Sequence, residues 1–341
     1  MTRLLQAMAG ARHGGAEAFF TRLALGLARA GVEQHLVIRE HAERAARLRA
    51  GGINVTELPF RSRLDLGTRV RLGRLIGDWQ PRVVLTWMSR ATAVMPPGPF
   101  VRVARLGGYY DLKYYRRCNH LIGNTRDIVA YLVKQGWPAE RAHYLPNFVE
   151  ERRMPPVARA GLGTPDEAPL VLALGRLHPV KGFDVLLQAV ARSAGLHLWL
   201  AGEGPEREAL QRQVLALGIA DRVRLLGWRE DVAALMATAD LLVCPSRHEP
   251  LGNVVLEAWA QCLPVIASAA EGPRALITQG ETGLLVPIGD ADALASAMAT
   301  LARDPTRQAE LADAGHAAYA AGFAEASVTA AYRDLIERVA S

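Results

Sequence analysis

The feature that most constrains the fold is an alternation of short apolar strands with amphipathic helices that runs through the chain twice. The first series has strand-like segments at 3–8, 33–39, 53–59, 82–87, 102–107 and 120–124, with helical patterns at 16–31 and 125–136. The second has strand-like segments at 169–177, 196–204, 222–228, 241–246, 263–269 and 283–290. Strands that alternate with helices predict parallel, doubly wound sheets. We therefore expect an α/β protein with two Rossmann-like domains that face a cleft, where such sheets bind ligands.

The two series meet at a segment without apolar periodicity. Residues 138–156 carry several prolines and charges, and we interpret this segment as the linker between the domains. The predicted domains are residues 1–150 and 151–322, and residues 323–341 form a final amphipathic helix. A length of 341 residues suits two domains of ordinary size.

Charge is distributed unevenly between the halves. Residues 1–150 contain 23 Lys and Arg against 11 Asp and Glu (+12), whereas residues 151–341 contain 17 against 23 (−6), which together give the net +6. The first half is expected to meet something anionic, unless the arginines reflect codon bias alone. Basic stretches at 61–74 and 109–117 belong to this half. No nucleic-acid-binding module accompanies them, so a phosphorylated or membrane-linked partner is favoured over nucleic acid.

No segment has the length and apolar character of a signal peptide or a spanning helix. We expect a soluble, cytoplasmic protein, with possible peripheral contact at the cytoplasmic face of an inner membrane. The three cysteines form no CxxC pair, and neither a metal site nor a disulfide framework is indicated.

Two glutamates flank a glycine turn after the strand at 241–246. Glu249 and Glu257 stand eight residues apart, and Gly252 lies between them before a helix that begins near Asn253. A helix N-terminus presents free N–H groups that suit a phosphate, while the carboxylates can accept hydrogen bonds from sugar hydroxyls.

Two cations follow the first strand of the second half. Arg176 and Lys181 stand in LGRLHPVKG, where a doubly wound fold has its ligand loop. A guanidinium, an ammonium and a helix N-terminus can neutralise a diphosphate without Mg²⁺. In the first half, Gly14 and Gly15 form a glycine-rich turn after the first strand, but the full dinucleotide and P-loop motifs are absent.

Taken together, these motifs resemble the large retaining GT-B glycosyltransferase family, the fourth family in the usual classification. The resemblance is strongest over 169–290, in ALGRLHPVKGFDVLLQAVA, LAGEGPEREALQ, VCPSRHEPLGNVVLEAWAQCLPVIAS and GETGLLVPIGDADALA. It continues more loosely through the N-terminal GG-A-E and the phrase YLPNFV. It implies an acceptor-side domain at 1–150, a nucleotide-sugar-binding domain at 151–322, and a last helix that returns to the first domain.

The same resemblance implies roles for matching positions. Arg176 and Lys181 would bind the donor diphosphate, Glu257 the ribose, and Glu249 the donor sugar. The remaining donor-binding positions it implies are the backbone of Leu251, Gly252, Asn253 and Val254, the base-framing pair Trp228 and Arg229, and the loop glycines Gly14, Gly15, Gly202 and Gly204. The resemblance implies a UDP- or GDP-sugar as donor, and because this nucleotide sugar is a substrate, no cofactor is expected.

One departure concerns the acceptor side. Many family members carry a histidine in the loop after the fourth or fifth strand of the first domain, but the loops here read TWMSRA and RLGGYYDLKYY. The polar groups available are Arg90, Tyr109, Tyr110, Asp111 and Lys113, with His13 as a further candidate. Asp111 is a possible base, and Arg90 or Lys113 a possible grip on an anionic acceptor.

The sequence thus predicts a hexosyltransferase-like enzyme that acts without metal on a glycan or lipid-linked acceptor, such as lipopolysaccharide core. The alternative is a nucleotide-sugar-binding GT-B protein with an epimerase or non-enzymatic role. An epimerase would need further acid and base carboxylates, and the four charged residues Arg176, Lys181, Glu249 and Glu257 favour the transferase.

Overall fold

The computed structural model describes residues 2–12, 14–62 and 64–341. Contacts divide the chain into two compact units. Unit 1 comprises Met1–Phe148 and Ala324–Ser341, and unit 2 comprises Val149–Phe323.

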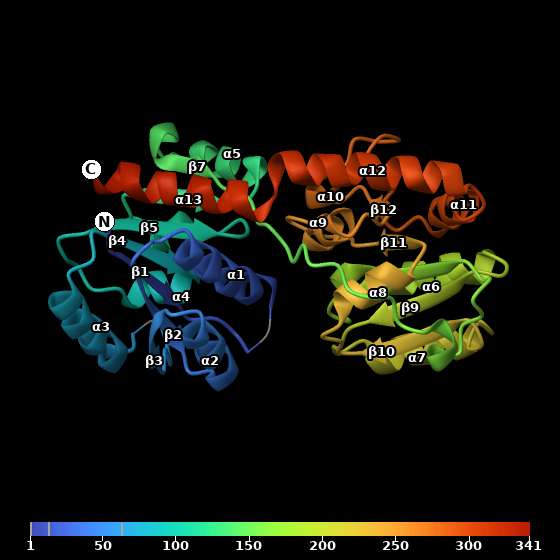
Figure 1. Ribbon diagram of the computed structural model, residues 1–341, viewed down its shortest axis with the longest axis horizontal. Helices are drawn as coiled ribbons and strands as arrows, with labels where there is room; N and C mark the ends of the chain where they lie inside the picture. Colours follow the sequence, from blue (N-terminus) through green and yellow to red (C-terminus); the bar gives the residue numbers. More distant parts are fainter. Residues whose placement is uncertain (1, 13, 63) are drawn as a thin grey trace. The chain divides into compact units, whose positions relative to one another are not determined.

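Unit 1 is built on a seven-stranded parallel sheet (Figure 1). Its strands are β1 (Leu4–Met8), β2 (Gln34–Arg39), β3 (Asn54–Leu58), β4 (Val83–Trp87), β5 (Val101–Leu106), β6 (His120–Gly123) and β7 (Ala142–Tyr144). They lie in the order β3-β2-β1-β4-β5-β6-β7. The order reverses between β1 and β4, so the loops after these two strands diverge at that point.

Helices cover both faces of this sheet. They are α1 (Gly15–Arg29), α2 (Ala42–Ala50), α3 (Leu66–Trp79), α4 (Met88–Val94), α5 (Arg126–Lys134) and α13 (Glu325–Ala340), with short 3-10 turns at Leu112–Tyr114 and Ala139–Arg141. One face packs against α1, α2 and α13, and the other against α3, α4 and α5. Because both faces are covered, the strands consist of nearly continuous apolar residues.

A buried arginine joins α13 to the sheet of unit 1. Arg105, at the carboxyl end of β5, is 4% exposed. Its Nε donates to the hydroxyl of Tyr332 on α13 at 3.2 Å, and its Nη2 donates to Asn147. The guanidinium also lies 4.8 Å from the ring centroids of Phe19 and Trp87. Aromatic faces and neutral hydrogen-bond acceptors thus surround the guanidinium of Arg105.

Unit 2 has a six-stranded parallel sheet in the order β10-β9-β8-β11-β12-β13. The strands are β8 (Leu170–Leu174), β9 (His197–Ala201), β10 (Val223–Gly227), β11 (Leu241–Cys244), β12 (Val265–Ser268) and β13 (Leu284–Val286). The helices are α6 (Phe183–Arg192), α7 (Arg207–Ala216), α8 (Val232–Thr238), α9 (Asn253–Ala260), α10 (Glu271–Leu276), α11 (Ala291–Leu301) and α12 (Pro305–Gly322), with 3-10 turns at Arg159–Leu162 and Pro179–Lys181. Two doubly wound parallel sheets confirm the predicted fold class.

The predicted linker is partly wrong. Residues 142–144, inside the segment assigned to the linker, form β7 and pair with β6 at the edge of the first sheet. The strand has only three residues, all half-buried, so its sequence lacks the apolar run by which the other strands were recognised. Among the described residues, no helix combines the length and hydropathy that crossing a membrane requires.

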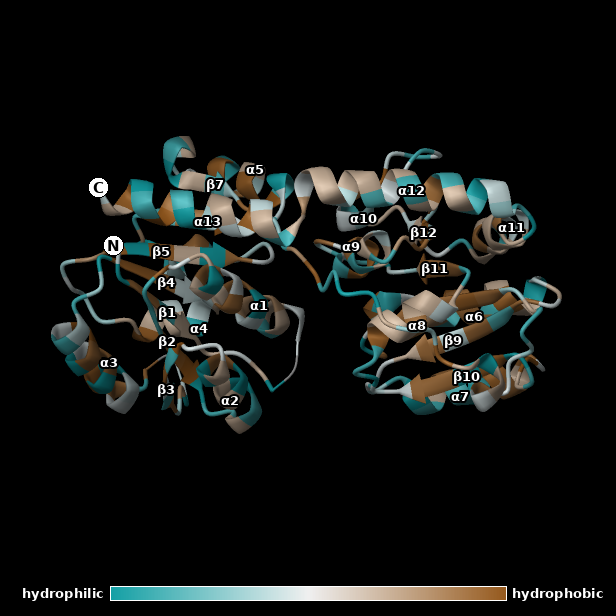
Figure 2. Cartoon of the chain, viewed as in Figure 1, coloured by the Kyte–Doolittle hydropathy of each residue, from teal (hydrophilic) through white to brown (hydrophobic). Residues whose placement is uncertain are grey.

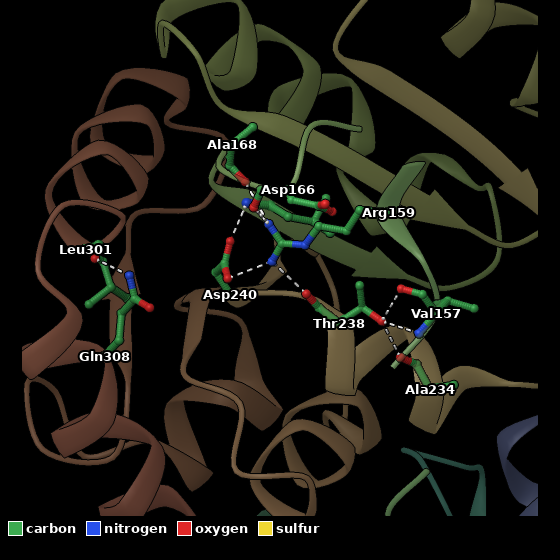
Figure 3. Close-up of polar contacts among 10 residues, drawn as sticks. Val157, Arg159, Asp166, Ala168, Ala234, Thr238, Asp240, Leu301 and Gln308 are labelled. Atoms are coloured by element: carbon green, nitrogen blue, oxygen red, sulfur yellow. Dashed lines mark hydrogen bonds and ion pairs between the residues drawn. The ribbon is translucent and has the colours of Figure 1, made fainter. Parts of the chain in front are cut away.

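An arginine anchors the amino-terminal edge of the second sheet (Figure 3). Arg159 donates to the carbonyls of Asp166 and Ala168 at 3.0 and 2.9 Å, and to the carbonyl of Thr238 at 2.8 Å. It also forms an ion pair with Asp240 at 2.8 Å, and the other oxygen of Asp240 accepts the N–H of Leu170 at 2.7 Å. This network aligns the starts of β8 and β11.

Replacing Arg159 by Ala is expected to destabilise unit 2. Asp240 would lose its cation in a partly buried place and three carbonyls would lose a donor, a cost of about 2–4 kcal/mol. The matched control is Arg192→Ala, because Arg192 pairs with Asp292 where both side chains are largely exposed, and this change should cost about 0–1 kcal/mol. Chemical denaturation of both variants measures the difference, and equal midpoints would contradict this reading of the network.

Candidate functional site

The candidate site of unit 2 lies where the strand order reverses between β8 and β11. Residues 175–182 follow β8 and residues 245–252 follow β11. The two loops are joined by a hydrogen bond from the N–H of Arg247 to the carbonyl of Val180 at 2.8 Å. Since both strands end at the same edge of the sheet, their loops bring together residues that are far apart in the sequence.

Lys181 and Glu249 meet across these loops. The ammonium of Lys181 donates to Oε2 of Glu249, and the two side chains are 24% and 12% exposed. Oε1 of Glu249 accepts the N–H of Gly252 at 3.3 Å, and the hydroxyl of Ser246 lies 3.5 Å from Oε2. The sequence predicted both charged residues, but it did not predict that they pair with each other.

Arg176 is exposed on the loop after β8. No hydrogen bond or ion pair joins its guanidinium to another part of the chain that the structure describes. Its charge is therefore available at the same edge of the sheet at which Lys181 lies.

Close backbone contact between neighbouring loops depends on a glycine after β9. Gly202 has φ 149°, and a Cβ atom there would lie 1.8 Å from the carbonyl oxygen of Gly175. The N–H of Gly175 in turn donates to the carbonyl of Ala201 at 3.0 Å. Gly204 makes a similar approach to Leu177. Both glycines shape the loop that bears Arg176.

Helix α9 starts beside Glu249 without a side-chain cap. Gly252, its N-cap residue, adopts the left-handed conformation with φ 82°, which glycine tolerates best. Leu251 is buried, whereas Asn253 and Val254 in the first turn are half-buried. Glu257 follows one turn later and is also half-buried. The positive end of the helix therefore lies next to the Lys181–Glu249 pair.

The two residues after β10 differ in their surroundings. Trp228 is 60% exposed. Arg229 forms two hydrogen bonds with Asp231, so its charge is balanced by a neighbour in the chain. The hydrogen bond holds the pKa of Asp231 below its usual value.

Three positioning contacts in unit 2 were not predicted. Glu271, at the start of α10, accepts the N–H of Glu249 at 3.4 Å and contacts Nδ1 of His248 at 3.1 Å. Arg247 pairs through both terminal nitrogens with Asp184 at 2.7 and 2.6 Å, which lowers the pKa of that carboxyl group. Glu271 comes from α10 and Asp184 from α6, far along the chain from the loop after β11, so no fixed spacing in the sequence indicates these contacts.

The glycine-rich loop of unit 1 is organised around a buried carboxylate. Gly14 caps α1 and Gly15 begins it. Glu17, which is 4% exposed, accepts the N–H of Ala11 at 2.6 Å. From α2, Arg44 donates to the carbonyls of Ala11 and Arg12 at 3.2 and 2.9 Å. The sequence predicted the glycine turn but not the contacts of Glu17 and Arg44 with the loop. His13 lies outside the described residues.

The candidate acceptor-side residues of unit 1 fall into separate groups. Asp111 pairs with Lys113 at 2.6 Å and also accepts its backbone N–H. The contacts with Lys113 lower the pKa of Asp111, which makes it a weaker base.

The remaining acceptor-side candidates are held by contacts within unit 1. Tyr109 is 40% exposed, donates to Asp127 and packs edge-on against Tyr131. Tyr110 is 36% exposed, and its carbonyl accepts the hydroxyl of Tyr131 at 3.2 Å. Arg90, on α4, is half-buried and donates to the carbonyl of Phe60 at 3.4 Å. Within the described ranges, no three His, Cys, Asp or Glu residues are grouped as metal ligands.

Comparison with known proteins covers both units. Residues 13–153 match the family described as Glycosyltransferase Family 4, and residues 168–304 match the family described as Glycosyl transferases group 1. Two proteins of Rhizobium meliloti (strain 1021) are each 38% identical to this chain. They are the lipopolysaccharide core biosynthesis glycosyltransferases LpsE and LpsD. The alignment with LpsE covers 95% of this chain and 96% of LpsE, and the alignment with LpsD covers 95% of this chain and 95% of LpsD.

A solved structure has the same fold over nearly the whole chain. It is Anabaena HepE in complex with UDP and glucose, which aligns with a TM-score of 0.86 at 21% identity. The alignment covers 99% of this chain and 100% of that chain. At this identity the likeness concerns the fold alone.

Replacing Gly202 by Ala is expected to destabilise unit 2 by about 2–4 kcal/mol, because the new Cβ collides with a backbone carbonyl and strains φ. The control is Gly195→Ala, at a glycine with φ 73° and no atom within 4 Å of a new Cβ, for which about 1 kcal/mol is expected. Thermal unfolding compares the two variants. A loss at position 202 no greater than at position 195 would show that the loops can separate at little cost.

Proposed function

The chain belongs to glycosyltransferase family 4 and has the GT-B fold of two Rossmann-like units, and from that premise we propose the reaction it performs. It transfers a sugar from a nucleoside-diphosphate sugar to a glycan or lipid-linked acceptor of the cell envelope, with retention of anomeric configuration and without a metal ion. The observation that carries the proposal is the meeting of Arg176, Lys181 and the uncapped start of α9 at one edge of a parallel sheet.

These three positive groups suit a diphosphate. Arg176 offers a planar fork of donors, Lys181 a compact charge, and α9 the N–H groups of its first turn. In the structure, Lys181 pairs with Glu249. A bound diphosphate would draw the ammonium toward its oxygens, and the carboxylate would turn to a sugar hydroxyl.

Glu249 is held in a defined orientation for that contact. Its backbone N–H and carbonyl are fixed by Glu271 and by the N–H of Gly272, the latter at 2.7 Å. The carboxylate keeps its bond to the N–H of Gly252. We assign the hydroxyl contact of the donor sugar to Glu249 and the ribose contact to Glu257. Trp228 and Arg229 frame the base.

The bond changes need no protein nucleophile. The bond between the anomeric carbon and the β-phosphate oxygen breaks, and the acceptor oxygen attacks from the same face. The proton of the acceptor hydroxyl passes to the departing diphosphate oxygen. Positive groups around the diphosphate stabilise its developing charge, which lowers the barrier.

The acceptor belongs to unit 1 in this proposal. Tyr109 and Tyr110 present partly exposed rings, which suit sugar faces, and Lys113 and Arg90 supply positive charge. The excess of arginine in the first 150 residues supports an anionic acceptor and peripheral contact with the inner-membrane surface. The names of the relatives LpsE and LpsD support lipopolysaccharide core as the acceptor. An epimerase or non-enzymatic role has no comparable support, and the cytoplasmic location stays a prediction.

Donor binding is expected to raise the midpoint of thermal unfolding for one class of nucleotide sugar in a panel of UDP- and GDP-sugars. Arg176→Ala and Lys181→Ala should each weaken that binding about tenfold to a hundredfold, because each removes a charge-assisted hydrogen bond to phosphate. Arg212→Ala is the control, since Arg212 is an exposed arginine of α7. Binding that is unchanged in the two loop variants, or that disappears in chelator, would refute the metal-free diphosphate site.

Glu249→Gln is expected to lower kcat about a hundredfold or more, because the charge that polarises the donor sugar is lost while the side-chain volume is kept. Lys181 loses its carboxylate partner in this variant, so a modest drop in the midpoint of ligand-free thermal unfolding is expected, and a cooperative transition shows that the variant is folded. Turnover is followed with the best-bound donor, and NMR of the product reads the anomeric configuration. Turnover at the wild-type rate in Glu249→Gln would remove Glu249 from the reaction, and an inverted product would exclude retention.

A further inference from the structure

An outward face of unit 1 combines large apolar side chains with arginines. Leu64, in the loop before α3, is 87% exposed, and Leu66 and Val70 on α3 are 73% and 53% exposed. Arg71 and Arg74 on the same helix are exposed as well. Residues 66, 70 and 74 follow at intervals of four and therefore lie in a row along the helix. We call these five side chains the α3 face.

Packing within unit 1 does not require these side chains. Helix α3 is anchored through Leu72 and Ile76, which lie in a core cluster with Phe60. Stretches of hydrophobic and hydrophilic residues alternate along α3 in Figure 2. The apolar side chains of the α3 face thus leave much of their area exposed to water.

Positive charge exceeds negative charge around the α3 face. Residues 61–78 contain five arginines and two acidic residues, Asp65 and Asp78. Asp65 is the N-cap of α3, where it accepts the N–H and the hydroxyl of Thr68 at 3.0 and 2.8 Å and the N–H of Arg61 at 2.9 Å. Arg71 and Arg74 make no ion pair with the residues that the structure describes.

We propose that the α3 face docks on a membrane that contains anionic phospholipid. The leucines and Val70 enter the boundary between headgroups and acyl chains, and the arginines contact lipid phosphates. An acidic protein would match the arginines but would not need three isolated apolar side chains, and the same side chains argue against nucleic acid. The inference rests on the peripheral membrane contact of the proposed function and names the surface that makes it.

Unit 2 offers a matched control for this surface. Leu215 on α7 is 67% exposed, and Arg212 is exposed on the same helix. An exposed leucine near an exposed arginine is therefore present in both units. Of these two helices, α3 has several exposed apolar side chains and several exposed arginines, and it belongs to the unit that carries the positive charge.

The experiment measures cosedimentation of the full chain with vesicles of phosphatidylcholine alone and mixed with phosphatidylglycerol. We expect the wild type to bind the mixed vesicles and to be released by salt. The double variant Leu64→Ser/Leu66→Ser should lower the affinity for the mixed vesicles about tenfold or more. The double variant Arg71→Gln/Arg74→Gln should lower that affinity about fivefold for each arginine replaced. Leu215→Ser and Arg212→Gln should bind as the wild type does.

Two results would overturn the proposal. One is equal vesicle binding by the α3 variants and the α7 controls. The other is a wild type that leaves vesicles unbound and instead self-associates in sedimentation velocity, with the association lost in Leu64→Ser/Leu66→Ser. Thermal stabilisation by the donor is measured for every variant, and because it does not involve α3, failure of the docking surface is distinguishable from failure of the transferase proposal.

Discussion

The adjacency of β8 and β11 decides where the charged groups of unit 2 meet. These strands are neighbours in the sheet although about seventy residues of chain separate them. Their connections leave in opposite directions, so the loops at their carboxyl ends open beside each other. The backbone makes contacts between these loops, as at Gly182, where a Cβ atom would lie 2.1 Å from the carbonyl oxygen of Pro245. The side chains of Arg176, Lys181 and Glu249 therefore lie at the surface of these loops.

Within that frame, the Lys181–Glu249 pair explains how both charges are tolerated in a partly buried place. The ammonium and the carboxylate neutralise each other, and the N–H of Gly252 donates a further hydrogen bond to the carboxylate. In the proposed reaction, the donor diphosphate competes for the ammonium and leaves the carboxylate to bind a sugar hydroxyl. The same two groups thus stabilise the loops without ligand and, in the proposed reaction, recognise different parts of the donor.

Unit 1 shows a different use of buried charge. Glu17 fixes the glycine-rich loop from within, and Arg105 joins α13 to the sheet among aromatic rings. Neither group is exposed enough to meet a large substrate directly, so their roles are structural. The surface arginines of this unit are the groups that we propose to contact anionic partners, and the α3 face adds exposed apolar side chains to them.

The sequence by itself determined the two doubly wound sheets, since the periods of strands and helices report which residues are buried along a short stretch of chain. It also indicated the glycine turns and the charged residues that follow particular strands. The sequence did not predict β7, because three half-buried residues are too few to show the alternating apolar pattern of a strand. Only the tertiary structure decided which side chains meet. Glu249 pairs with Lys181, 68 residues away, while Glu271 of α10 and Asp184 of α6 bind the same loop through Glu249 and Arg247. Such pairs depend on the spatial order of the strands, which no local pattern of residues records.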